Sequence, residues 1–198
     1  MADSVNVALD SFGYPGRTRE EVRSFVGNGI RKLIERSVPS GTAEEMIPKV
    51  HEVFTTHYQK HCADKTKPYD GILELLLQMK KQGVKTAVVS NKADYAVKAL
   101  CLQYFPELLD VAVGEREGIA RKPAPDTVNE VLHVLGAEKT GAVYIGDSDV
   151  DVETAQNAGM DCIAVDWGFR TKKVLVQAGA KVIISKPEEL MKYVLAES

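Results

Sequence analysis

The sequence has few cysteines, one tryptophan and no long run of apolar residues. Its three cysteines, Cys62, Cys101 and Cys162, are an odd number and lack the close pairing of a disulfide framework or a cysteine zinc site, so we expect reduced thiols. No apolar stretch approaches the roughly 20 residues that a membrane-spanning helix requires, and the polar start MADSVN does not resemble a signal peptide. These features predict a cytoplasmic protein without a membrane partner.

A strong charge of either sign is also lacking. The formal net charge is -3, without the basic stripe that binds nucleic acid by counterion release. A small soluble partner is therefore the better prediction. The 198 residues, 44% of them hydrophobic, can bury a substantial core, as one domain with an insert or as two small domains.

The most metal-like group of side chains is a histidine pair. His57 and His61 stand four residues apart in a helical pattern, and Cys62 follows directly. The segment lacks the glutamate of an HExxH motif. We therefore interpret it as a solvated helix face.

Residues 1–67 show a helical pattern. Apolar residues recur at spacings of three and four in VNVALDSF, VRSFVGNGIRKLIERSV and MIPKVHEVFTTHYQKHC. Thr18 followed by Glu21 predicts a capping box at the start of the second helix. The pattern indicates a small all-helical subdomain.

From residue 68 to residue 198 helices alternate with strands. The expected strands are VKTAVVS, DVAVG, GAVYIGD, DCIAV and AKVIIS, and a helix PEELMKYVLAE ends the chain. Such alternation is typical of βαβ units, and the uninterrupted apolar cores TAVVS and AVYIG suit strands buried on both faces. The fold class predicted is α/β, a Rossmann-like parallel sheet with helices on both faces.

Polar residues follow three of these strands, where parallel sheets bind ligands. Ser90 and Asn91 follow TAVVS, and Lys122, in Arg121-Lys122-Pro123, follows the short strand DVAVG. GDSDVD follows AVYI, with carboxylates at Asp147, Asp149 and Asp151. Singly, each has an ordinary explanation as a helix cap or a loop. Together they predict a phosphoryl group held by Ser90, Asn91 and Lys122, beside a Mg²⁺ ion held by Asp147.

The same segments resemble a known family. VVSNK, RKPAPD and YIGDSDVDVETAQNAGM are similar to the second, third and fourth motifs of the haloacid dehalogenase superfamily. FVGNGIRKLIERS and VDWGFR are similar to segments of its phosphoglycolate phosphatases. The likeness extends over essentially the whole chain.

The resemblance implies a role for each matching side chain. Ser90 would bind a phosphoryl oxygen with Asn91 beside it, and Lys122 would neutralise charge on the phosphate. Asp147 would ligate Mg²⁺, and Asp151 would complete the metal site by orienting its ligands. Residues 1–67 would form a cap over the substrate, with specificity contacts from Gly27, Asn28, Gly29 and Arg31; an ordinary glycine turn between helices explains these residues equally well.

One motif of that family has no counterpart in the sequence. The family's first strand ends in Asp-x-Asp-Gly-Thr, which supplies the nucleophile and the general acid and base. Asp3 and Asp10 lie in a helical pattern, so neither suits that role. We therefore expect that the sequence starts inside the first cap helix, that the sheet is interrupted between VKTAVVS and GAVYIGD, and that these 198 residues alone do not turn over phosphate esters.

The function predicted is that of a magnesium-dependent phosphatase acting on a small phosphorylated metabolite, most like phosphoglycolate phosphatase. The alternative is a catalytically inactive relative that binds a phosphorylated ligand or a protein. A mutase, dehalogenase or phosphonate hydrolase ranks last, because Gly146, Asp147 and Ser148 match the phosphatase pattern. The exact substrate and the oligomeric state stay open.

Overall fold

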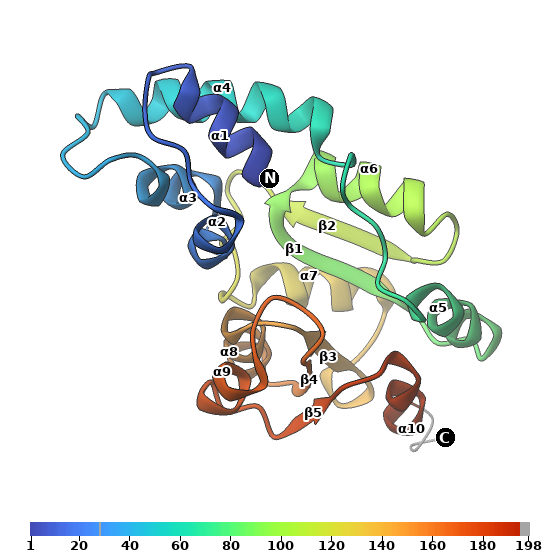
Figure 1. Ribbon diagram of the computed structural model, residues 1–198. Coiled ribbons are helices and arrows are strands. Elements are labelled where there is room, and N and C mark those ends of the chain that lie inside the picture. Colours follow the sequence, from blue (N-terminus) through green and yellow to red (C-terminus); the bar gives the residue numbers. More distant parts are fainter. Residues whose placement is uncertain (28, 195–198) are drawn as a thin grey trace. The chain divides into compact units, whose positions relative to one another are not determined.

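The structure is a computed structural model that describes residues 1–27 and 29–194 of the chain. It divides into two compact units, Met1–Lys67 and Pro68–Ser198 (Figure 1). The division falls at the residue where the sequence changes from a purely helical pattern to alternating strands and helices.

The first unit, here called the helical unit, is built from α1 (Ala2–Asp10), α2 (Arg19–Phe25), α3 (Gly29–Ser37) and α4 (Met46–His61). Its core gathers apolar side chains from all four helices, among them the fully buried Leu9, Ile34 and Phe54. The capping box is confirmed: Glu21 N–H donates to Thr18 Oγ1 at 3.2 Å, and Thr18 N–H donates to Glu21 Oε2 at 2.7 Å. This exchange satisfies two donors that a helix start leaves open.

The periodic run VRSFVGNGIRKLIERSV divides into two helices. Val26 leaves the helical conformation with ψ of 150°, and Gly27 has φ of 129°. A residue with a Cβ rarely adopts that φ, so the glycine permits the break that separates α2 from α3.

The second unit, here called the α/β unit, alternates helices and strands as predicted. Its elements in chain order are α5 (Ile72–Lys81), β1 (Ala87–Ala93), α6 (Asp94–Tyr104), β2 (Val111–Glu115), α7 (Asp126–Leu135), η1 (Lys139–Gly141), β3 (Val143–Gly146), α8 (Asp149–Ala158), β4 (Asp161–Val165), α9 (Lys172–Gln177), β5 (Val182–Ile184), η2 (Pro187–Leu190) and α10 (Met191–Val194).

Alternate side chains of β4 explain why helices cover both faces of its sheet. Ile163 and Val165 pack into a cluster with Leu75 of α5, while Ala164 packs with Val152 of α8 on the other face. Because strand side chains point alternately to opposite faces, a strand covered on both sides must be apolar throughout. Residues CIAV of the strand DCIAV meet that requirement, and the exposed Asp161 stands at its start.

The parallel strands form two separate sheets. β1 pairs with β2 in the register Val88 to Ala112, and β3, β4 and β5 pair in that order, with Tyr144 opposite Cys162. Among the described residues no strand pairs with both β1 and β3, which confirms the predicted interruption between these two segments.

Helix α7 connects the two sheets. It packs against β1 and β2 and also against α8, and in Figure 1 it lies between β1 and β3. Its Val128 and Leu132 form one apolar cluster with Tyr144 of β3, against which Val89 of β1 also packs. Side-chain packing on α7 therefore holds together sheets that share no ladder of hydrogen bonds.

Within the part of the chain that the structure describes, no helix combines the length and the apolar character needed to cross a membrane. The end of the chain departs from the expected single helix, since PEELMKYV forms the short η2 followed by α10, and residues 195–198 lie outside the described part.

Candidate active site

The site is centred on the ammonium group of Lys122, in the loop between β2 and α7. Lys122 Nζ donates to the Val89 carbonyl of β1 at 3.1 Å, to the Tyr144 hydroxyl of β3 at 3.2 Å and to Asp151 Oδ1 of α8 at 2.8 Å. The lysine and aspartate side chains are only 12% and 9% exposed. One nearly buried cation thus joins the two sheets at the carboxyl ends of their strands.

The backbone of Lys122 is fixed by Asn91. The Lys122 N–H donates to Asn91 Oδ1 at 2.8 Å, and Asn91 Nδ2 donates to the Lys122 carbonyl at 2.9 Å. The side-chain amide thus serves as a two-point clamp between β1 and the loop. Ser90 stands between Val89 and Asn91, and its hydroxyl accepts the Lys92 N–H at 3.1 Å.

Both carboxylate oxygens of Asp151 accept hydrogen bonds. Oδ1 takes Lys122 Nζ and the Tyr144 hydroxyl at 3.1 Å, and Oδ2 takes Ser148 Oγ at 2.6 Å and the Asp147 N–H at 3.2 Å. Burial alone would raise the pKa of Asp151, but the Lys122 charge and these hydrogen bonds lower it. Asp151 is therefore held as an anion that orients its neighbours.

Asp147 has a different environment. Burial raises the pKa of its carboxyl group, and the negative charge of Asp151 adds to that effect, while the Phe169 N–H, donating to Oδ2 at 3.0 Å, opposes it. Gly168 is required here because a Cβ at that position would overlap the Asp147 carboxylate. The loop after β4 is thereby closed over the turn after β3.

Asp149 at the start of α8 is half exposed and forms an ion pair with Arg170, at 2.9 Å between Oδ1 and Nε. The Arg170 N–H also donates to the Asp147 carbonyl at 3.0 Å. Arg170 therefore ties the loop after β4 both to the turn after β3 and to the first turn of α8.

The residues fit a magnesium ion in part. Mg²⁺ prefers oxygen ligands and is commonly held by one or two carboxylates together with water and substrate phosphate. Asp147 supplies such a carboxylate. Burial disfavours its charged form and raises its pKa, and a bound cation would stabilise that charged form. Among residues 1–27 and 29–194, however, no group of three or more His, Cys, Asp or Glu side chains could hold a metal ion. Asp147 would thus be a direct ligand, with Asp151 positioned to orient the site.

Of the predicted site residues of the α/β unit, Asn91, Lys122, Asp151 and Asp147 are brought together by these contacts. The Ser90 hydroxyl makes a local bond to the Lys92 N–H, and its phosphate contact remains a prediction. The predicted specificity residues belong to the helical unit. There Arg31 forms ion pairs with Glu35 and Glu44, and Gly27 and Gly29 have positive φ values of 129° and 83°. Asn28 lies outside the described residues, and the substrate contacts of this group remain a prediction.

Two members of the site were not anticipated from the sequence. Tyr144 is nearly buried and donates to Asp151, and burial raises the pKa of its hydroxyl group. A tyrosine inside an otherwise apolar strand is a usable signal, because a buried hydroxyl needs a hydrogen-bond partner. Arg170 ends VDWGFR, a segment that carries the family resemblance, but no role could be assigned to it because the sequence does not define the path of that loop.

The chain is similar to known hydrolases. The family model for haloacid dehalogenase-like hydrolases matches residues 1–165. A phosphoglycolate phosphatase of Aquifex aeolicus is 32% identical and covers 97% of this chain, which covers 87% of that protein. An N-acetylmuramic acid 6-phosphate phosphatase of Pseudomonas aeruginosa is 29% identical, with 90% of this chain and 80% of that protein covered.

A solved structure gives the same result. The crystal structure of a candidate phosphoglycolate phosphatase from Lactobacillus delbrueckii subsp. bulgaricus is 37% identical and superposes with a TM-score of 0.92. The match covers 99% of this chain and 91% of that chain. With the ammonium, carboxylates and strand-end turns placed as described, this chain belongs to the haloacid dehalogenase-like hydrolase family.

Proposed function

We propose that this chain forms the phosphate- and magnesium-binding part of a phosphatase that acts on a small phosphorylated metabolite. The observation that carries the proposal is the position of Lys122 Nζ, between the end of β1 and the carboxylate of Asp151, whose other oxygen accepts the backbone N–H of Asp147. An ammonium beside a candidate Mg²⁺ ligand can stabilise the charge that develops on a transferring phosphoryl group.

Phosphoglycolate is the first substrate to test, because relatives named as phosphoglycolate phosphatases share about a third of their residues with this chain. The Pseudomonas relative named for N-acetylmuramic acid 6-phosphate is almost as similar. N-acetylmuramic acid 6-phosphate is therefore the second substrate to assay, in parallel with phosphoglycolate. Mg²⁺, when bound, would polarise the phosphoryl oxygens, and Asp147 is the residue that we propose as its direct ligand.

We further propose that the nucleophile belongs to a strand that is not among these 198 residues. The separation of β1 from β3 supports this, since both strands lie in one compact unit and each lacks a neighbour on one edge among the described residues. An apolar parallel strand ending in Asp-x-Asp-Gly-Thr would satisfy both edges and direct its aspartate toward Lys122.

The deciding experiment compares two proteins under the same conditions. The first is the chain as it stands, and the second is the chain extended at its amino end by the first strand and Asp-x-Asp-Gly-Thr motif of a family member. With Mg²⁺ and either phosphoglycolate or p-nitrophenyl phosphate, we expect turnover only from the extended protein.

Variants of the extended protein test the named residues. Lys122→Ala should lower kcat by about 100-fold or more, as removal of one charge-stabilising group commonly does. Asp147→Asn should weaken the dependence of the rate on Mg²⁺. Turnover by the unextended chain, surviving removal of trace host phosphatases, would show that one of its own residues is the nucleophile.

A second function is favoured by one observation, the full set of partners already held by Lys122 and Asp151. Because the Lys122 ammonium already has three hydrogen-bond acceptors, it is less available to a transferring phosphoryl group. This would suit a catalytically inactive relative that binds a phosphorylated ligand or a protein. Binding of phosphate or tungstate by the extended protein without any turnover would support that function over catalysis.

A further inference from the structure

The carboxyl-terminal turn of α4 carries two histidines whose rings lie face to face. His57 and His61 are four residues apart, their ring centroids are 4.2 Å apart and their planes differ by 23°. Residues four apart lie on the same face of a helix, so both rings project from one side of α4. Both histidines belong to the helical unit, whereas the proposed phosphate site uses residues of the α/β unit.

Each ring is held by its Nδ1 atom. His57 Nδ1 lies 3.0 Å from Ser4 Oγ, a side chain of α1 that is 1% exposed. His61 Nδ1 lies 2.7 Å from Asp64 Oδ2, just beyond the helix. A histidine that binds a metal commonly engages a carboxylate or hydroxyl partner through its other ring nitrogen, because this fixes the tautomer and the ring orientation.

The two Nε2 atoms are left for another ligand. No described residue is bonded to either of them, and the His61 side chain is 46% exposed. A solvated helix face, the interpretation favoured by the sequence alone, does not require both Nδ1 atoms to be fixed. The structure shows that both Nδ1 atoms have partners, which the spacing of the two histidines in the sequence could not show.

We propose that His57 and His61 form a two-histidine binding site for a first-row divalent cation of the Zn²⁺ type. Imidazole suits Zn²⁺, Ni²⁺ and Cu²⁺, whereas Mg²⁺ prefers oxygen ligands. Water would complete the coordination, because the described residues include no group of three or more metal-binding side chains. Cys62 is not a third ligand, since its thiol faces the Gln59 carbonyl and packs on the helical core.

Binding requires a small movement of the rings. A metal ion lies near the plane of each imidazole that holds it, whereas the rings here are stacked. One or both must turn about the Cβ–Cγ bond while Ser4 and Asp64 follow. The bound cation would then join two side chains of α4 that also contact Ser4 of α1 and Asp64, so it would stabilise the helical unit.

The experiment titrates ZnCl₂ into the whole chain at pH 7.5 by calorimetry, with thermal unfolding in parallel. We expect one Zn²⁺ per chain and a rise in unfolding temperature, because a ligand that binds only the folded state stabilises it. His57→Gln and His61→Gln should each lower the affinity for Zn²⁺ by about tenfold or more. Loss of a partner that only orients a ligand already has an effect of that size, and these variants remove the ligand itself. Asp64→Asn should give a smaller loss.

Controls separate this site from other sources of binding. The variants His133→Gln, on α7, and Cys62→Ser should bind Zn²⁺ like the unchanged chain. MgCl₂ should raise the unfolding temperature of the unchanged chain and of the two histidine variants equally, if at all. Absence of Zn²⁺ binding, or an affinity in both histidine variants equal to that of the unchanged chain, would overturn the proposal. Neither result bears on phosphatase turnover, which depends on Lys122 and Asp147.

Discussion

Replacing Lys122 by methionine tests how strongly its ammonium stabilises the α/β unit. Methionine keeps most of the aliphatic length but removes the charge, so Asp151 loses its closest cationic partner at 2.8 Å. Both side chains are nearly buried, at 12% and 9% exposure. The variant therefore leaves the Asp151 carboxylate without its cation in a poorly solvated position, where water cannot replace the lost partner as it would at the surface.

The expected magnitude follows from the remaining contacts. Breaking a buried ion pair from one side typically costs about 3–5 kcal/mol, because the other charge stays buried without compensation. Asp151 retains donors from Ser148, Tyr144 and the Asp147 backbone, so we expect the lower end, about 3 kcal/mol in the free energy of unfolding. That is a large share of the roughly 5–15 kcal/mol typical of a domain.

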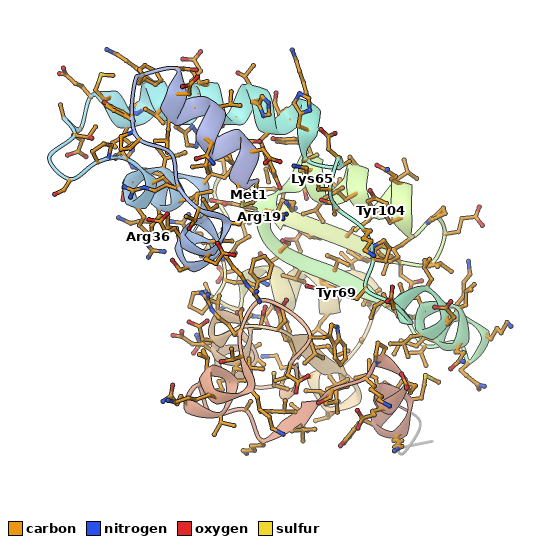
Figure 2. All side chains as sticks on the ribbon, viewed as in Figure 1. Met1, Arg19, Arg36, Lys65, Tyr69 and Tyr104 are labelled. Carbon is orange, nitrogen blue, oxygen red and sulfur yellow. The ribbon has the colours of Figure 1, made fainter. Side chains whose placement is uncertain are left out.

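Lys65→Met is the matched control. Lys65, labelled in Figure 2, forms an ion pair with Asp3 at 2.7 Å, but the two side chains are 66% and 60% exposed. Exposed pairs contribute about 0–1 kcal/mol, so this variant should unfold almost like the unchanged chain. The two substitutions are chemically identical, but the ion pair broken at Lys122 is buried and Lys122 also loses its bonds to Val89 and Tyr144.

The assay is urea unfolding at several pH values, followed by circular dichroism. In the unchanged chain the pKa of Asp151 is lowered, so its stabilising contribution is fully present above the ordinary value of 3.8 and is lost as the pH falls through the folded-state pKa. Without Lys122, burial raises that pKa instead. The stability deficit of Lys122→Met should therefore shrink in acid as Asp151 takes up a proton.

Two results would refute this reasoning. One is a deficit for Lys122→Met no larger than that for Lys65→Met at neutral pH. The other is a deficit that stays constant, or grows, as the pH falls below about 4, where the variant carboxylate should become neutral. A double variant, Lys122→Met with Asp151→Asn, should recover part of the loss, because it removes the uncompensated charge.

Three further outcomes follow from the structure. Thr18→Ala removes the capping box and should destabilise the helical unit by about 0.5–2 kcal/mol, measured by urea unfolding. Gly168→Ala should cost about 1–3 kcal/mol through overlap with the Asp147 carboxylate, whereas Gly141→Ala, which has open space, should change little. Asp147→Asn should raise stability at pH 7, and the gain should vanish below about pH 3.8, because a raised pKa stabilises the folded state only where the proton is bound. Parallel melts at pH 7 and pH 3.5 check that sign.

The fold was predictable where pattern and local chemistry agree. The alternation of β4, with Ile163 and Val165 on one face and Ala164 on the other, is visible in DCIAV, as is the capping box at Thr18. Periodicity was less informative across Val26 to Gly29, because apolar spacing continues through a break that depends on backbone conformation. A hydrophobic pattern records which face is buried and not where a helix ends.

The grouping of Asn91, Lys122, Asp147 and Asp151 was predictable from the sequence, but Tyr144, Arg170 and the hydrogen bonds were not. Strand-end position identified Ser90, Asn91, Lys122 and the acidic turn, since parallel strands end at one edge of a sheet. The clamp between Asn91 and the Lys122 backbone joins residues 31 positions apart, and the Arg170 contacts join positions 21 to 23 apart. Such pairings depend on loop paths that composition and spacing do not define.

The residues expected to bind phosphate also connect the two sheets. β1 and β3 share no partner among the described residues, so the links across that interval are packing on α7 and polar contacts through Lys122 and Asn91. The Val89 carbonyl uses an ammonium where a strand interior would offer a backbone N–H. A phosphate that recruits Lys122 must therefore compete with a contact that holds the sheets together, whereas a strand inserted between β1 and β3 would satisfy Val89 and release the ammonium for the ligand. Completing the sheet and preparing the phosphate site would on this view be the same physical event.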